Sequence, residues 1–197
     1  MGQPQLRQAR LMPQDLILFG VQGSGKGTQA QILADKLGYV IFEAGAELRK
    51  IRASDTELGR QVKSIIDAGN LVPNEIVMEI VAEFLKGVSA EEPVIFDGIP
   101  RSMVQKESLD ALLDKHERDA VCLHIRLPRE VAIARMQERG RADDTAEVIK
   151  TRIDNFEAQT VPVIDKYAAE GKMLQVDGDQ PIEQVTEAIL DVLAKVE

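Results

Sequence analysis

The sequence has little cysteine, with Cys122 as the single one in a chain of 197 residues. A lone cysteine excludes an internal disulfide and a zinc site with four cysteine ligands, so we expect no structural zinc. Residues 120–125 read Ala-Val-Cys-Leu-His-Ile. This pattern is typical of a buried strand, in which a cysteine acts as a small apolar side chain. Such sparse cysteine usage favours a reducing, cytoplasmic setting.

Long apolar runs are also missing. No stretch approaches the roughly 18–20 residues that cross a bilayer, so we expect no membrane association of that kind. Residues 1–14 are polar and lack the hydrophobic core of a secretion signal. We expect them to form a flexible N-terminal extension, followed by one domain over residues 15–197.

Positive charge is in deficit, because 24 Lys and Arg residues stand against 33 Asp and Glu residues. The formal net charge of −9 disfavours nucleic acid as a partner, since such binding needs a broadly basic surface. A chain with this balance can bind a smaller polyanion only where it gathers its lysines and arginines locally.

What the sequence does contain is a glycine-rich loop, residues 20–28, which reads Gly-Val-Gln-Gly-Ser-Gly-Lys-Gly-Thr. It lies between the apolar run 16–19 and a helical pattern over 29–37. Consecutive backbone N–H groups of such a loop can wrap a polyphosphate, and the following helix adds its positive end. Lys26 then reaches the outer phosphates, and the Thr28 hydroxyl lies near a phosphate-bound Mg²⁺. A glycine-rich turn without a ligand is the alternative, but the flanking elements favour a nucleotide site.

Apolar segments alternate with helical patterns along the chain. The expected strands cover residues 16–19, 39–42, 94–96, 121–127 and 173–176. The expected helices cover residues 29–37, 59–68, 74–85, 106–115, 130–138, 145–156 and 182–196. This alternation predicts an α/β fold, with a parallel five-stranded sheet covered by helices on both faces. In such a sheet, ligands bind at the carboxyl ends of the strands, where the glycine-rich loop also lies.

A second polar segment, residues 96–101, reads Phe-Asp-Gly-Ile-Pro-Arg and follows an expected strand. Asp97 at the end of that strand is positioned to support Mg²⁺ through water, as in many phosphate-loop enzymes. Taken alone, Asp-Gly here is equally typical of an ordinary turn. The glycine-rich loop and the following Arg101 favour the functional interpretation.

Arginines gather further along the chain, at positions 135, 139, 141 and 152. The first two are four residues apart and so share one helical face, for which a surface ion-pair cluster is the alternative role. The run 139–144, Arg-Gly-Arg-Ala-Asp-Asp, interrupts the helix before the next one starts near Thr145. Planar guanidinium groups around a transferring phosphoryl group supply the charge stabilisation that such a reaction needs.

In order and spacing, these motifs resemble those of the adenylate kinase family of nucleoside monophosphate kinases, over about residues 15–193. The matching segments are residues 20–29, 45–49, 67–73, 97–101 with Gln105, 139–144, 160–164 and 176–178. The resemblance implies a P-loop NTPase core with two mobile parts. These are a helical monophosphate-binding insertion, about residues 43–73, and a short lid, about residues 137–147.

The resemblance also implies an activity, namely reversible Mg²⁺-dependent phosphoryl transfer from ATP to AMP, which serves adenine nucleotide homeostasis and is carried out by a monomer. The residues implied to bind ATP are Gly23, Ser24, Gly25, Lys26, Gly27, Thr28, Arg135, Arg139 and Gln180. Those implied to bind the monophosphate are Ala44, Arg49, Ile66, Asn70, Val72, Gly98, Arg101, Gln105, Arg141 and Arg152. The implied catalytic residues are Lys26, Arg101, Arg135, Arg141 and Arg152. No residue is expected to ligate the metal directly, because Mg²⁺ is held by the nucleotide and by water near Thr28 and Asp97.

Residues 43–47 depart from the family pattern, because Glu-Ala-Gly-Ala stands where the family usually has Ser-Thr-Gly-Asp. Ala44 resembles the uridylate–cytidylate kinase branch, whereas Gln105 favours AMP as the acceptor. Glu43 also places a negative charge near the entry of an anionic acceptor. Two alternatives therefore stay open: a kinase that prefers UMP, CMP or dAMP, and a nucleotide-binding module that has lost transfer activity.

Overall fold

The computed structural model describes residues 14–141 and 144–196. Within them the strands are β1 (Asp15–Phe19), β2 (Val40–Glu43), β3 (Val94–Asp97), β4 (Ala120–Arg126) and β5 (Met173–Asp177). They form one sheet in the order β2-β3-β1-β4-β5, and every neighbouring pair is parallel. The predicted parallel five-stranded sheet is thus confirmed.

Helices connect the strands. In the described residues they are α1 (Lys26–Leu37), α2 (Ala44–Arg52), α3 (Glu57–Asp67), α4 (Asn74–Lys86), α5 (Met103–Lys115), α6 (Arg129–Arg139), α7 (Ala146–Asn155), α8 (Val161–Ala169) and α9 (Ile182–Leu193). A π-helical turn, η1 (Phe156–Thr160), joins α7 to α8. The predicted helices are all present, whereas α2 and α8 were not expected as separate helices.

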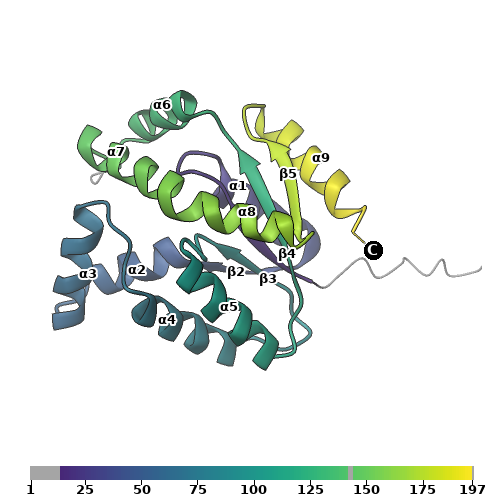
Figure 1. Ribbon diagram of the computed structural model, residues 1–197, viewed down its shortest axis with the longest axis horizontal. Helices are drawn as coiled ribbons and strands as arrows, with labels where there is room; N and C mark the ends of the chain where they lie inside the picture. Colours follow the sequence, from purple (N-terminus) through teal and green to yellow (C-terminus); the bar gives the residue numbers. More distant parts are fainter. Residues whose placement is uncertain (1–13, 142–143, 197) are drawn as a thin grey trace, which may run out of the picture.

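The sheet is buried on both faces because successive side chains of a strand point to opposite sides. On β1, Leu16 and Leu18 pack with α1 and α9, while Ile17 and Phe19 pack with α4, α5 and α8. All four side chains are almost fully buried. Figure 1 shows the resulting three layers. The predicted coverage of both faces is confirmed.

Two pairs of helices lie at the end of the molecule toward which the strands run (Figure 1). One pair, α2 and α3, falls within the insertion predicted over residues 43–73. The other pair, α6 and α7, flanks the lid predicted over residues 137–147, of which residues 142–143 lie outside the described part. The predicted extension over residues 1–14 also lies outside it, except for Gln14. The division into core, insertion and lid stays a prediction.

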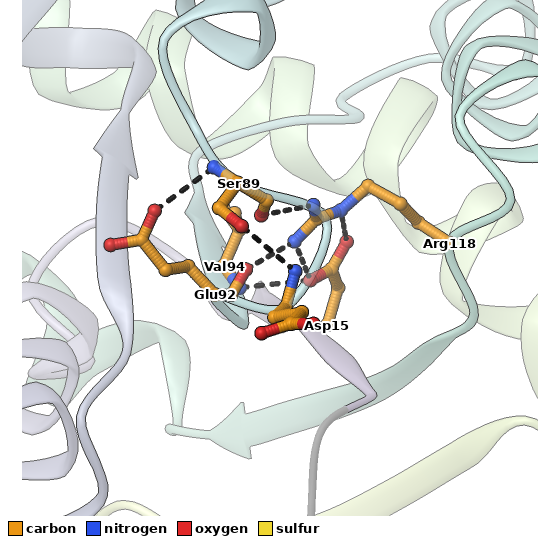
Figure 2. Close-up of polar contacts among 6 residues, drawn as sticks. Asp15, Ser89, Glu92, Val94 and Arg118 are labelled. Atoms are coloured by element: carbon orange, nitrogen blue, oxygen red, sulfur yellow. Dashed lines mark hydrogen bonds and ion pairs between the residues drawn. The ribbon is translucent and has the colours of Figure 1, made fainter.

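The opposite end of the sheet is closed by a buried ion pair between Asp15, the first residue of β1, and Arg118 (Figure 2). Arg118 donates from Nε to Asp15 Oδ2 at 2.7 Å and from Nη2 to Oδ1 at 2.8 Å. Asp15 Oδ1 also accepts the backbone N–H of Val94 on β3. The guanidinium completes its bonds on the backbone carbonyls of Ser89 and Glu92. This network ties the starts of β1 and β3 to the segment that leads into β4.

Candidate active site

The glycine-rich loop runs from the end of β1 across the start of α1. Gly23 and Gly25 both have φ of 90°, a left-handed conformation that glycine adopts without strain. At Gly23 a side chain is also excluded by space, because an added Cβ would lie 3.0 Å from the carbonyl oxygen of Ala132. Lys26 opens α1, and its Nζ donates to Gly20 O at 2.7 Å and to Val21 O at 3.2 Å. The loop therefore brings an ammonium group and a helix N-terminus to the same place.

Asp97 ends β3 beside this loop and is only 7% exposed. Burial raises the pKa of its carboxyl group, and the positive charge of Lys26 opposes that shift. Burial likewise lowers the pKa of Lys26, and Asp97 opposes that shift in turn. A Cβ added at Gly27 would contact Asp97 Oδ2 at 3.7 Å, so the carboxylate lies against the first turn of α1.

Arg101 follows β3 and is held by its own neighbourhood. Its Nε donates to Gly98 O at 2.7 Å, and its backbone N–H donates to Gln105 Oε1 at 2.8 Å. Thr160, on the π-helical turn, donates its hydroxyl to the carbonyl oxygen of Arg101 at 2.9 Å. Burial lowers the pKa of the Arg101 guanidinium, and Asp97 opposes that shift. The backbone and the Nε of this arginine are thus fixed, and the rest of its guanidinium faces a cavity.

That cavity, which we name the first cavity, lies between the carboxyl ends of the strands and the helices α2 and α7. It is lined by every residue predicted to bind the monophosphate: Ala44, Arg49, Ile66, Asn70, Val72, Gly98, Arg101, Gln105, Arg141 and Arg152. Lys26 and Arg139, which were predicted to bind ATP, line it as well. The chain therefore brings together, from segments far apart in the sequence, the residues that the motifs had singled out.

A second cavity lies on the other side of the glycine-rich loop, against α9. Its lining includes the remaining residues predicted to bind ATP, except Gly27: Gly23, Ser24, Gly25, Thr28, Arg135, Arg139 and Gln180. Gly27 lines neither cavity. Arg139 lines both, whereas Lys26, which follows Gly25 in the chain, lines the first cavity. The two cavities therefore share one cation, Arg139.

The arginines of α6 and α7 are paired with carboxylates. Arg139 donates to both oxygens of Asp144, and Arg152 donates from Nη1 to Asp144 Oδ1 at 2.6 Å. The Asp144 side chain is 1% exposed, so these two guanidinium groups enclose it. Arg135 instead faces the β5–α9 turn, where it donates to Gly178 O and lies 3.4 Å from Asp179 Oδ1. These arginines therefore form ion pairs and also line the cavities, so an ion-pair role does not exclude a role in ligand binding.

Arg49 and Arg141 both line the first cavity. Arg49, on α2, donates from Nη2 to Glu43 Oε1 at 2.7 Å. Burial lowers the pKa of Arg141, and the nearby Arg139 lowers it further. Concentrated positive charge of this kind favours a polyanionic ligand.

Two side chains of this region were not among the predicted site residues. Asp144 was quoted as the last residue of the segment 139–144, with no role of its own in the site, directly before Thr145, which caps α7 by accepting the N–H of Val148. Gln22, inside the glycine-rich loop, lines the first cavity, and its buried Oε1 has no hydrogen-bond partner among the described residues. The place of Gln22 between Gly20 and Gly23 was the signal that could have identified it.

A divalent metal was expected near Thr28 and Asp97, held through nucleotide and water. Both side chains offer oxygen atoms, which are the donors that Mg²⁺ prefers. Within residues 14–141 and 144–196, no three His, Cys, Asp or Glu side chains gather as a metal-binding group. In the same residues every helix is too short or too polar to cross a membrane.

Comparison with known proteins gives consistent results. A family model described as adenylate kinase matches residues 18–172. The chain is 39% identical over 184 residues to an adenylate kinase of Maricaulis maris, an alignment that covers 91% of this chain and 98% of that protein. It is 40% identical over 172 residues to adenylate kinase 1 of a Nostoc species, covering 87% and 94%. It is 35% identical over 187 residues to an adenylate kinase of Parabacteroides distasonis, covering 92% and 98%.

Proposed function

The chain belongs to the adenylate kinase family, and from that premise we propose that it catalyses reversible, Mg²⁺-dependent transfer of a phosphoryl group from ATP to AMP, giving two ADP. The observation that carries the proposal is the pair of cavities that share Arg139 in their linings, with Lys26 lining the first and the glycine-rich loop before it lining the second. A two-nucleotide kinase needs two anion sites that share one boundary, because the phosphoryl group must move directly between donor and acceptor.

In this reaction the glycine-rich loop binds the phosphates of ATP. Its backbone N–H groups and the start of α1 surround the phosphate chain, while Lys26 supplies a mobile positive charge. Arg135 borders the adenine and ribose from α6. Lys26 then lies where the outer phosphate meets the first cavity, which supports its role in the transfer step.

The first cavity receives the monophosphate. Arg49 and Arg101 bind the acceptor phosphate, while Arg139, Arg141 and Arg152 surround the group in transfer. The acceptor oxygen is already ionised, so no side chain has to remove a proton. Catalysis then consists of positioning the two phosphates and of stabilising the charge that spreads over the transferred group.

Thr28 and Asp97 are the residues that would hold Mg²⁺, the hydroxyl from the start of α1 and the carboxylate through water. When bound, Mg²⁺ would neutralise charge on the ATP phosphates. The insertion over residues 43–73 and the lid over residues 137–147 would close on the nucleotides and exclude water, which prevents hydrolysis of ATP.

The choice of acceptor depends on the base end of the first cavity. Ala44 and Gln105 both line it, together with the apolar side chains of Ile66 and Val72. The Gln105 side chain accepts the N–H of Arg101 through Oε1, which leaves its Nε2 to donate to a base. We propose AMP as the preferred acceptor, and a role in adenine nucleotide homeostasis for a monomeric enzyme.

Initial rates with ATP and each of AMP, dAMP, CMP and UMP test this proposal. Fastest turnover of AMP supports it, whereas faster turnover of CMP or UMP would assign the chain to a kinase of another acceptor. ATP binding without ADP formation from any of the four monophosphates would instead favour the inactive nucleotide-binding module.

A further inference from the structure

Glu43 is a carboxylate beside the first cavity that pairs directly with Arg49, a predicted ligand of the acceptor phosphate. It ends β2 beside Asp97 of β3, with which it is in register. It is also the N-cap residue of α2, but its side chain makes no capping hydrogen bond. Instead, the carboxylate reaches Arg49, six residues further on, at 2.7 Å.

The surroundings of Glu43 are those of an anion site. Burial lowers the pKa of Lys26, Arg101 and Arg141, and the negative charge of Glu43 opposes that shift in all three. The carboxylate therefore acts on four of the cations assigned above to the two phosphates, counting Arg49. An acceptor phosphate bound by these cations would lie in the field of the same carboxylate.

The backbone leaves room for the Glu43–Arg49 contact at Gly45. A Cβ added there would lie 3.0 Å from Arg49 Nη1 and 3.6 Å from Glu43 Oε1. Because a contact of 3.0 Å is tighter than packed atoms normally make, a side chain at this position would displace the guanidinium. The glycine thus permits Arg49 to fold back over the start of α2 and meet Glu43.

We propose that Glu43 tunes the affinity for the acceptor: it competes with the acceptor monophosphate for Arg49, and thereby raises the KM of the acceptor. This inference rests on the proposed function, in which Arg49 binds the acceptor phosphate. Both side chains of the pair are 40% exposed, and ion pairs of that exposure are weak. A phosphate dianion can therefore replace the carboxylate, at the cost of breaking one pair.

The size of the effect follows from the fraction of Arg49 that is free. If the pair is worth about 1 kcal/mol, the free fraction is roughly one sixth, and apparent acceptor affinity falls by roughly the same factor. Repulsion between Glu43 and the bound phosphate acts in the same direction. Glu43 acts only weakly on Lys26, because burial and the charges of Asp97, Arg101 and Arg139 act more strongly there. The KM of ATP should therefore not change measurably.

The test compares Glu43→Gln with a matched control, Glu47→Gln. Glu47 lies on α2, the helix that also carries Arg49. It pairs with Lys50 at 2.6 Å, but it lines neither cavity. We expect Glu43→Gln to lower the KM of AMP by roughly fivefold, with kcat within about twofold of wild type and an unchanged KM of ATP. The control should leave all three values unchanged. A raised KM of AMP in Glu43→Gln would overturn the proposal, because it would mean that Glu43 orients Arg49 for the acceptor.

A double-mutant cycle separates competition for Arg49 from general repulsion. In an Arg49→Ala background, Glu43→Gln should change the KM of AMP by less than about twofold, since no guanidinium is left to release. An equal effect in both backgrounds would contradict the competition.

Calorimetric titration of AMP distinguishes a failure of this inference from a failure of the proposed function. If the wild-type enzyme transfers no phosphoryl group to any monophosphate, the proposed function fails, but tighter AMP binding by Glu43→Gln than by wild type would still support the competition. If transfer proceeds normally and Glu43→Gln binds AMP as wild type does, the inference fails alone.

Discussion

Arginine and carboxylate side chains meet at both ends of the sheet, with different results. At the amino ends of the strands, Asp15 and Arg118 form a buried pair in which every bond is made to fixed partners (Figure 2). At the carboxyl ends, cations outnumber the carboxylates beside them. We name this group the carboxyl-edge cations: Lys26, Arg49, Arg101, Arg135, Arg139, Arg141 and Arg152. The same types of side chain therefore form a structural ion pair where charges are balanced, and a cavity lining where positive charge is in excess.

The comparison is tested most strongly at Arg101, a carboxyl-edge cation whose Nε donates to Gly98 O. Arg101→Ala should lower kcat/KM for AMP by about a thousandfold or more, because a guanidinium near the transferred charge is lost. ATP binding, measured by calorimetry, and the free energy of unfolding should change little. Arg129→Ala is the matched control, since Arg129 pairs with Asp154 and Glu157 but lines neither cavity. Near-normal turnover of Arg101→Ala would refute its role.

Arg118 should give the opposite pattern. Arg118→Ala leaves the Asp15 carboxylate buried without its charged partner, so the free energy of unfolding should fall by about 3–5 kcal/mol. Urea denaturation measures this change, and kcat per folded molecule should equal that of wild type. Replacing both partners, as Arg118→Met with Asp15→Leu, should recover only part of the loss, because the N–H of Val94 would lose its acceptor. If Arg118→Ala were stable but had an impaired kcat, the amino end of the sheet would not be a purely structural region, and the contrast with the carboxyl end would be wrong.

Asp144 combines features of both ends, because it is buried like Asp15 but holds two of the carboxyl-edge cations. Asp144→Asn keeps the side-chain volume and removes the charge that positions Arg139 and Arg152. We expect kcat/KM to fall about tenfold to a hundredfold, since small displacements of positioning groups are costly in rate. The change in unfolding free energy should be smaller than for Arg118→Ala. Steady-state kinetics measures the loss of kcat/KM in Asp144→Asn. Urea denaturation of the same preparation shows whether its unfolding free energy changes less than that of Arg118→Ala.

His124 tests whether the carboxyl edge tolerates one more positive charge. Burial, with smaller contributions from Arg126 and Lys26, lowers the pKa of His124 to about 4. Because the unfolded chain binds this proton near pH 6.5, the unfolded state gains protons first as pH falls. His124 therefore stabilises the fold at neutral pH, and about 2 kcal/mol of that stability should be lost between pH 6.5 and pH 4.

The measurement is the difference in unfolding free energy between wild type and His124→Gln at several pH values, which cancels the titration of other groups. The difference should shrink as pH falls through this range. An unchanged difference would mean that the pKa of His124 is the same in the folded and unfolded states.

The sequence predicts the strands and most of the helices well, because these elements depend on local patterns of apolar and polar residues. Each predicted strand agrees with the structure to within about a residue, since apolar runs between polar turns leave little choice. Helix α8, which contains Pro162, was not predicted, and a proline in the interior of a helix would break it. The proline instead occupies the first turn, where its missing N–H would have had no helical partner anyway.

The pairings within the site could not be predicted in the same way. Motif order singled out the residues that line both cavities, but it gives no information on which carboxylate meets which arginine. Glu43 pairs with Arg49 only because α2 starts directly after β2 and turns the arginine back. Asp144 was given no role of its own in the site, because its pairing with Arg139 and Arg152 depends on α6 and α7 lying side by side.

One practical consequence follows from the polarity of β1. The chain enters this strand at Asp15, beside Arg118, and leaves it at Phe19, next to the glycine-rich loop. A linker fused ahead of Gln14 would therefore join the fold at the end remote from both cavities. Molecules grafted to a bead or an electrode through such a linker would face their nucleotide sites outward, and an immobilised layer should retain the turnover of the free enzyme.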